Sequence, residues 1–225
     1  MITLFIDLET IKCQNKYHID YIISKIKPHH ACKTDEAKQK SIEKQKEEVI
    51  EKTVFDGAYG EIVTIGYALD DRETIALQRD LLLTEKMILQ TFFDALKVEA
   101  ERVNQSASNF QVRWVAHNKE FDFRYLYQRS VINNINTHGI KIPVDARHGA
   151  KEAYCTMQAW KGFGAKAGGS LDAICKVLGL EGKKGFTGAD VYGAWDRGEY
   201  QIIADYCKDD VNLTRSIYKR LNFIR

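Results

Sequence analysis

Residues 4 to 10 read Leu4-Phe5-Ile6-Asp7-Leu8-Glu9-Thr10, and this stretch decides the fold that we expect. Apart from Thr3 and Asp7, the first eight residues are apolar, which predicts a strand buried on both faces. Side chains alternate along a strand, so Asp7 and Glu9 project to the same side. Two carboxylates that repel each other at a buried strand end favour a divalent metal between them. The alternative is a surface strand end with two solvated acids.

The composition indicates a soluble globular protein of one large domain or two small ones. The chain has 225 residues, of which 44% are hydrophobic and 28% charged, and its net charge is only +2. A nucleic-acid surface would therefore have to concentrate basic residues locally. We see no secretory signal and no run of about 18 apolar residues, so we expect no membrane span. The five cysteines form no CxxC pair, which favours free thiols in the cytoplasm.

Residues 11–60 differ from the rest of the chain. Between Lys33 and Lys52 there are six lysines and six acids, with no glycine or proline. This run predicts an exposed helix with ion pairs one turn apart, packed along one edge of the body. It is either a solvated arm or an arm that covers or feeds the active site. The cysteines and histidines of this insertion make a zinc site conceivable, although their spacing matches no zinc-finger pattern.

Beyond residue 60 the pattern predicts a mixed sheet flanked by helices, an α/β fold. We expect strands near 61–69, 73–78, 110–116, 140–144 and 154–157. We expect helices near 84–103, 118–134, 170–178, 189–197 and 199–221. The positions of Thr84, Asn118 and Ser170 suit helix N-caps, and Gly179 suits a helix end.

Three further polar side chains stand at the margins of predicted buried surfaces. Asp122 falls in the first turn of its helix, where the dipole favours an anion. Tyr206 and Asp210 are one turn apart and flank the inward stripe of the last helix, whereas Asp209 points about 100° away. The simpler alternatives are an acid that only stabilises its helix, and a hydroxyl–carboxylate bond that only joins two turns.

These residues carry a family resemblance. In this order and spacing, Asp7-x-Glu9, Asn118-x-x-Phe121-Asp122 and Tyr206-x-x-x-Asp210 resemble the three exonuclease motifs of the DEDD superfamily. The tyrosine resembles the DEDDy branch, which includes the proofreading domains of family B DNA polymerases. The stretch from Ser170 to Leu180 is similar to stand-alone, often phage or bacterial, members. The resemblance leaves out residues 11–60, and Cys155 stands close to where an acid is expected.

The resemblance implies a ribonuclease H-like fold and a single exonuclease domain over residues 1–225. It implies a 3′→5′ exonuclease with two divalent ions, Mg²⁺ or Mn²⁺, in a microbial or phage-encoded protein. Asp7 would bridge both ions, Glu9 and Asp210 would hold the ion that carries the attacking water, and Asp122 would hold the other. Tyr206 would orient the water.

The expected substrate is nucleic acid, most of all a single-stranded DNA 3′ end. Thr10, Asn118 and Phe121 are candidate contacts, although Phe121 would equally suit the core. Lys166 lies in the glycine-rich loop 161–169, which either follows the strand backbone or is an ordinary surface loop. His117 is a structural neighbour or, less simply, a catalyst.

Two other functions remain open at this stage. The same scaffold could trim RNA, or it could hold nucleic-acid ends without cutting them. A replication or repair partner is also possible, and no feature of the sequence identifies one.

Overall fold

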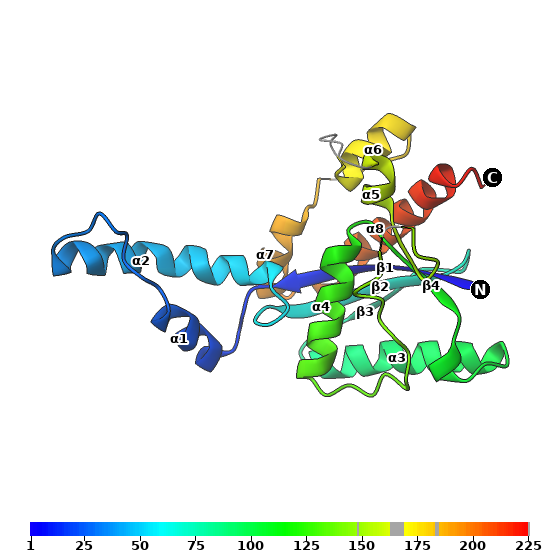
Figure 1. The fold of residues 1–225 in the computed structure, drawn as a ribbon, viewed down its shortest axis with the longest axis horizontal. Coiled ribbons are helices and arrows are strands. Elements are labelled where there is room, and N and C mark those ends of the chain that lie inside the picture. Colours follow the sequence, from blue (N-terminus) through cyan, green and yellow to red (C-terminus); the bar gives the residue numbers. More distant parts are fainter. Residues whose placement is uncertain (148, 163–168, 183–184, 225) are drawn as a thin grey trace.

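The computed structural model describes residues 1–147, 149–162, 169–182 and 185–224. Its elements are β1 (Ile2–Ile11), α1 (Lys16–Ser24), α2 (Asp35–Lys52), η1 (Thr53–Phe55), β2 (Glu61–Leu69), β3 (Ile75–Gln78), α3 (Glu85–Arg102), η2 (Ala107–Asn109), β4 (Val112–Ala116), α4 (Lys119–Ile132), β5 (Ala153–Cys155), α5 (Thr156–Lys161), α6 (Leu171–Leu178), η3 (Gly188–Asp190), α7 (Val191–Asp196) and α8 (Tyr200–Leu221). The strands form one sheet in the order β3-β2-β1-β4-β5 (Figure 1). β1 runs antiparallel to β2 and parallel to β4, so the sheet is mixed, as predicted.

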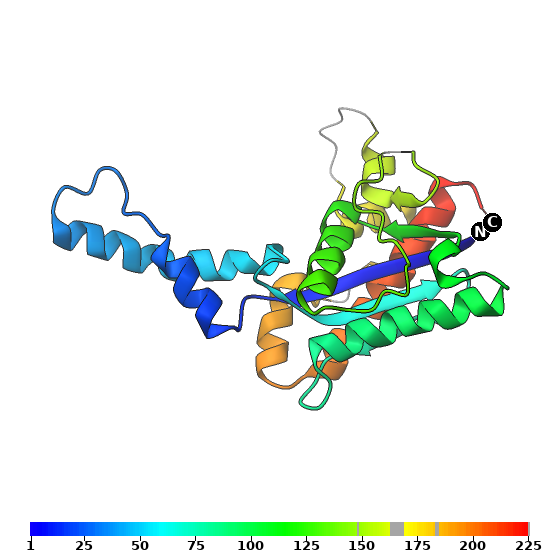
Figure 2. The same ribbon diagram turned by 60° about the horizontal axis from the view of Figure 1, so that its bottom comes forward.

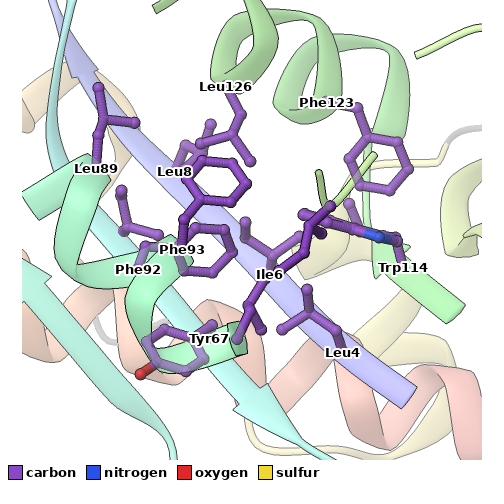
Figure 3. Packing of buried hydrophobic residues seen from close by; sticks show 14 of the residues in the cluster. Leu4, Ile6, Leu8, Tyr67, Leu89, Phe92, Phe93, Trp114, Phe123 and Leu126 are labelled. Atoms are coloured by element: carbon purple, nitrogen blue, oxygen red, sulfur yellow. The ribbon is translucent and has the colours of Figure 1, made fainter. Parts of the chain in front are cut away.

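The central strand β1 is buried from both sides. Its even-numbered side chains Leu4, Ile6 and Leu8 meet α3 and α4 in the largest hydrophobic cluster, shown in Figure 3. The aromatic rings of this cluster pack edge to face, with Phe92 and Trp114 centroids 6.1 Å apart. On the opposite face, Phe5 packs against Val211 and Tyr218 of α8. The prediction of a two-sided buried strand is confirmed.

The predicted helix ends are mostly confirmed. The side chain of Thr84 accepts a hydrogen bond from the Met87 N–H, and that of Ser170 accepts one from the Ala173 N–H. Gly179 ends α6 in the left-handed region with φ of +67°. Asn118 precedes α4 as expected, but its side chain makes no capping bond. The prediction of a side-chain cap at Asn118 is therefore wrong.

Residues 12–55, which we call the arm, project from the end of the sheet (Figures 1 and 2). Neither α1 nor α2 contains a buried residue, so the expected packing along the body is wrong. The predicted exposed, ion-paired helix is confirmed in α2, where Lys52 bonds Glu48 at 2.6 Å, whereas α1 was not predicted. The arm is solvated because its apolar residues are too few to cover the sheet.

One predicted strand is wrong. The segment 140–144 pairs with no described strand. Pro143 has no N–H to give to a ladder, and the Val144 N–H bonds the Ile142 carbonyl in a tight turn. The strand expected near residue 154 is confirmed as β5. Within the described chain, none of the helices is both long and apolar enough to cross a membrane.

Candidate active site

Asp7 and Glu9 lie on the face of β1 that α8 covers. Asp7 is half-buried and Glu9 is 7% exposed. One carboxylate oxygen of each lies within 4.8 Å of the other and of the Cys207 Sγ of α8. The alternation of side chains along the strand thus brings both acids to one place, as expected.

The pairing of β1 with β2 is irregular beside these acids. Glu9 pairs with Thr64 and Thr10 with Ile62, so Val63 is an extra residue on β2. The Val63 carbonyl accepts a hydrogen bond of 2.8 Å from the Arg79 N–H instead. Such bulges increase strand twist and re-aim side chains, and they are frequent beside active sites.

Helix α8 brings Tyr206, Cys207 and Asp210 to the two acids of β1. The Cys207 thiol lies 3.5 Å from the Asp7 carbonyl and 3.7 Å from Asp7 Oδ2, close enough to donate to both. The Tyr206 hydroxyl hydrogen-bonds the carboxylate of Asp210, which is 5% exposed. Burial raises the pKa of Tyr206 far above its ordinary value, and the charges of Asp210, Glu9 and Asp7 raise it further. Its hydroxyl therefore stays protonated among three carboxylates.

Asp122 completes the group from α4. It is 3% exposed, and burial raises the pKa of its carboxyl strongly. The backbone N–H groups of Asp122, Leu8 and Asn118 bond this carboxyl and oppose the rise, while the charge of Asp210 adds to it. The last β1–β4 pair is Phe5 with Val115, so Leu8 lies beyond the paired part of this edge. Asp122 therefore reaches the site where β1 extends past β4.

A pocket of about 570 Å³ opens beside Glu9. It is lined by Glu9, Thr10, Val54, Phe55, Phe121 and Tyr192, among others. Two of the expected substrate contacts, Thr10 and Phe121, therefore line the same pocket. The Thr10 hydroxyl donates to the Val54 carbonyl at 3.0 Å, so that side chain also holds the base of the arm.

Comparisons with known proteins place this chain in a family. Residues 55–225 match the model of a family described as a predicted 3′-5′ exonuclease related to the exonuclease domain of PolB. The chain belongs to this family. The match begins at Phe55, so Asp7, Glu9 and nearly all of the arm lie outside it.

The structure is also similar to that of the family B DNA polymerase from the hyperthermophilic archaeon Pyrobaculum calidifontis. The TM-score is 0.59 and the identity 13%, over 99% of this chain and 24% of the polymerase chain. This likeness confirms the expected ribonuclease H-like α/β fold. The chain spans about a quarter of the polymerase. None of the curated proteins matches this member of the exonuclease family.

The remaining candidate residues of this exonuclease-family chain have varied surroundings. His117 bridges Thr156 Oγ1 at 2.9 Å and the Gly169 carbonyl at 2.8 Å, which supports a structural role. Cys155, at the place of the expected acid, caps α5 by accepting from the Gln158 N–H. The Phe121 ring packs against the buried Tyr125 ring at 5.2 Å. Lys166 lies outside the described residues.

The donor set of this exonuclease-family site suits a hard cation. Asp7, Glu9, Asp122 and Asp210 offer carboxylate oxygens, the ligands that Mg²⁺ and Mn²⁺ prefer. Buried carboxylates whose charges raise each other's pKa need a compensating positive charge. Among the described residues, the possible ligand atoms that lie within 4.8 Å of one another belong to Asp7, Glu9 and Cys207. Asp122 and Asp210 are not part of this group. Among the described residues, the cysteines and histidines of the arm form no group of this kind.

Four residues at this site were not predicted from sequence patterns. Cys207 belongs to the inward stripe of α8, and its position directly after Tyr206 is the available signal. Lys12, Phe55 and Tyr192 line the pocket, but no spacing rule connects them. They come together only through the path of the arm.

Proposed function

We propose that this chain is a metal-dependent 3′→5′ exonuclease that removes nucleotides from the 3′ end of single-stranded DNA. The observation that carries the proposal is the meeting of carboxylates from β1 and α8 at Tyr206, whose pKa is raised by its burial and, further, by the charges of Asp210, Glu9 and Asp7. That result requires side chains from β1 and α8 to face one another. The family's predicted activity supports the reaction class.

In this proposal, Asp7 would help to hold both of two ions, Glu9 and Asp210 would hold one of them, and Asp122 would hold the other. Two such ions, Mg²⁺ or Mn²⁺, would neutralise charge on the phosphate, activate water and stabilise the leaving 3′-oxyanion. Asp122 suits its role because a cation would offset the cost of its buried charge. Cys207 donates to Asp7 and so restricts the direction of that carboxylate.

Tyr206 orients the attacking water in this scheme and does not take its proton. Its hydroxyl stays protonated because burial and the nearby carboxylates raise its pKa. The water oxygen forms a bond to phosphorus while the bond from phosphorus to the 3′ oxygen breaks. One water proton is lost to solvent, and the departing 3′ oxygen takes up another, which leaves a 5′-monophosphate and a strand one nucleotide shorter.

Digestion of a 5′-labelled single-stranded DNA tests this proposal. With Mg²⁺ or Mn²⁺ we expect a ladder that shortens from the 3′ end, and none with EDTA. Asp7→Ala should abolish it, because Asp7 is the residue that this proposal assigns to both ions. Asp209→Ala is the matched control, since Asp209 is exposed and adjacent to Asp210 on α8, and it should cut normally.

The other outcomes distinguish the alternatives. Degradation of a matched RNA but not of DNA would support the same reaction with RNA as the substrate. No product with either metal, together with a retained gel shift, would favour a module that binds ends without cutting. A contact between the loop at Lys166 and the DNA backbone stays a prediction. A weaker dependence of DNA binding on salt concentration in Lys166→Ala would support it.

A further inference from the structure

The positive charge of the chain is concentrated in one segment of the arm. Residues 14–34 contain four lysines and a single acid, Asp20. Helix α2, which follows, contains five lysines and six acids. Because the whole chain has a net charge of +2 and this segment alone has +3, the remaining residues together carry a net charge of −1. A local concentration of basic residues is what a nucleic-acid surface requires.

The four lysines of this segment are available to a ligand. Each is exposed, and within the described part of the chain none forms an ion pair: Lys16, Lys25, Lys27 and Lys33. On α2, by contrast, three lysines each pair with an acid of the same helix. An ammonium group that has no carboxylate partner binds a phosphate without first breaking another ion pair.

Two exposed tyrosines lie on one face of α1. Tyr17 is 76% exposed and Tyr21 is 47% exposed, and they are one helical turn apart. One turn further, the Lys25 Nζ lies 5.0 Å from the centroid of the Tyr21 ring. Ile19 and Ile23 are half-buried on the opposite side of the helix. The face formed by Tyr17, Tyr21 and Lys25, which we call the α1 stripe, suits a single strand, whose bases stack on rings while its phosphates contact ammonium groups.

Contacts on both sides of α1 hold the α1 stripe in place. The Gln45 side chain of α2 donates a hydrogen bond of 3.2 Å to the Lys27 carbonyl. On the other side, the His18 ring packs edge to face against the Tyr59 ring, outside the arm, with centroids 5.9 Å apart. The stripe is therefore formed before any strand binds.

The α1 stripe is within reach of the candidate active site. Tyr17 follows Glu9 by eight residues, so their Cα atoms are at most about 29 Å apart. Helix α1 lies on the part of the arm nearer the sheet (Figures 1 and 2). Phosphates along one stacked strand are about 3.4 Å apart, so about nine nucleotides cover the greatest possible distance. A strand whose 3′ end lies at Glu9 can therefore contact the stripe.

We propose that the α1 stripe, with the lysines beside it, binds the single-stranded nucleic acid on the 5′ side of the nucleotide that is removed. Tyr17 and Tyr21 stack on bases, and the lysines contact phosphates. Neither kind of contact reads the edge of a base, so the binding is independent of sequence. This inference rests on the proposed exonuclease function and assigns the arm a part in it.

Fluorescence anisotropy of a labelled oligothymidylate of about 20 nucleotides, in EDTA so that nothing is cut, measures this binding. Lys25→Gln combined with Lys27→Gln should reduce the slope of log Kd against log salt concentration by about 1.4, because each phosphate contact on a single strand contributes about 0.7. Lys40→Gln combined with Lys44→Gln is the matched control. It removes the same charge from exposed positions of the same arm, but among the acids of α2, and should leave the slope unchanged.

A second pair of substitutions tests the stacking. Tyr17→Ala combined with Tyr21→Ala should raise Kd at least about tenfold without changing the slope, because stacking releases no counterions. The loss should disappear on an oligonucleotide of the same length that is abasic except for its last few 3′ nucleotides, because no upstream bases remain to stack. Helix α1 contains no buried residue, so the variants should unfold at the same temperature as the wild type.

The opposite results would overturn the proposal. If the lysine variant binds like the wild type, or if the control changes the slope as much, the segment does not bind the strand, and an acidic protein becomes the partner to seek. An equal loss of affinity for both oligonucleotides in the tyrosine variant would contradict the stacking. No binding by the wild type would overturn the proposal as well. Because this assay involves no cleavage, digestion of the same DNA with Mg²⁺ tests the proposed exonuclease function separately.

Discussion

Gly66 of β2 faces Cys207 of α8 across a gap with no room for a side-chain carbon. A Cβ on Gly66 would lie 2.7 Å from the Cys207 Sγ, 3.0 Å from Val211 Cγ2 and 3.2 Å from the Cys207 carbonyl. Gly66 also pairs with Asp7 in the sheet. This contact therefore sets how closely α8 approaches the strand that carries the first two acids.

The first prediction concerns this gap. Gly66→Ala should lower the free energy of unfolding by about 1–3 kcal/mol, as overpacking does, and should reduce activity by displacing Tyr206 and Asp210. Adding Cys207→Ala should recover part of the stability, because it removes the nearest atom. Denaturant unfolding measures both effects. Gly193→Ala is the control, because its tightest contact is the flexible Arg197 guanidinium at 3.2 Å, and an unchanged Gly66→Ala protein would contradict the prediction.

The second prediction distinguishes the role of Tyr206 from that of the four carboxylates. Tyr206→Phe should lower kcat by about a hundredfold with little change in KM, because in the proposed mechanism it removes only the group that orients water. Stabilisation of the fold by Mn²⁺ should persist, since all four carboxylates remain. Steady-state kinetics and thermal unfolding with Mn²⁺ provide the two readouts. Tyr218→Phe, on the same helix but bonded to Arg113, should leave the rate unchanged.

The third prediction is that Asp122 lowers stability when no cation is bound. Asp122→Asn should unfold at the same or a higher temperature than wild type in EDTA, because the amide has no buried charge. Mn²⁺ at a hundred times its Kd should stabilise the wild type by about 2.7 kcal/mol and the variant by less. Activity should be lost in the variant. A clear drop in its melting temperature in EDTA would contradict this account.

The fourth prediction concerns acid stability at a site remote from catalysis. Hydrogen bonds from Arg72 and Arg102 lower the pKa of Glu99 from 4.5 to about 2. A lowered folded-state pKa contributes stability above pH 4.5, and that contribution is lost as the pH falls from 4.5 toward 2. Both arginines are partly exposed, so salt should weaken the effect.

Unfolding of wild type and Glu99→Gln at pH 7 and pH 3 measures this contribution. The difference in stability between the two proteins should shrink at pH 3. Glu101→Gln, whose side chain is 60% exposed, is the control and should show no comparable change. If the wild type is more stable than Glu99→Gln by the same amount at both pH values, the link between stability and the lowered pKa of Glu99 is contradicted.

Local signals explain which features were predictable. The apolar run of β1, the caps at Thr84 and Ser170, and the inward stripe of α8 depend on residues close in the chain. Two predictions failed where the periodicity of the sequence does not fix the hydrogen-bond partners. The Asn118 side chain does not cap its helix, and the segment 140–144 contains Pro143, which cannot complete a ladder. The roles of the individual site residues stay proposals.

The sequence by itself determined the central buried strand with Asp7 and Glu9 on one face, and the helical turn that pairs Tyr206 with Asp210. Both follow from the fixed periods of strand and helix. Only the tertiary structure decided that Cys207 contacts Asp7, that Leu8 bonds Asp122, and that Phe55 borders the pocket beside Glu9. These contacts depend on where β4 ends, on the bulge at Glu9 and on the room beside Gly66, and no local period encodes such long-range distances.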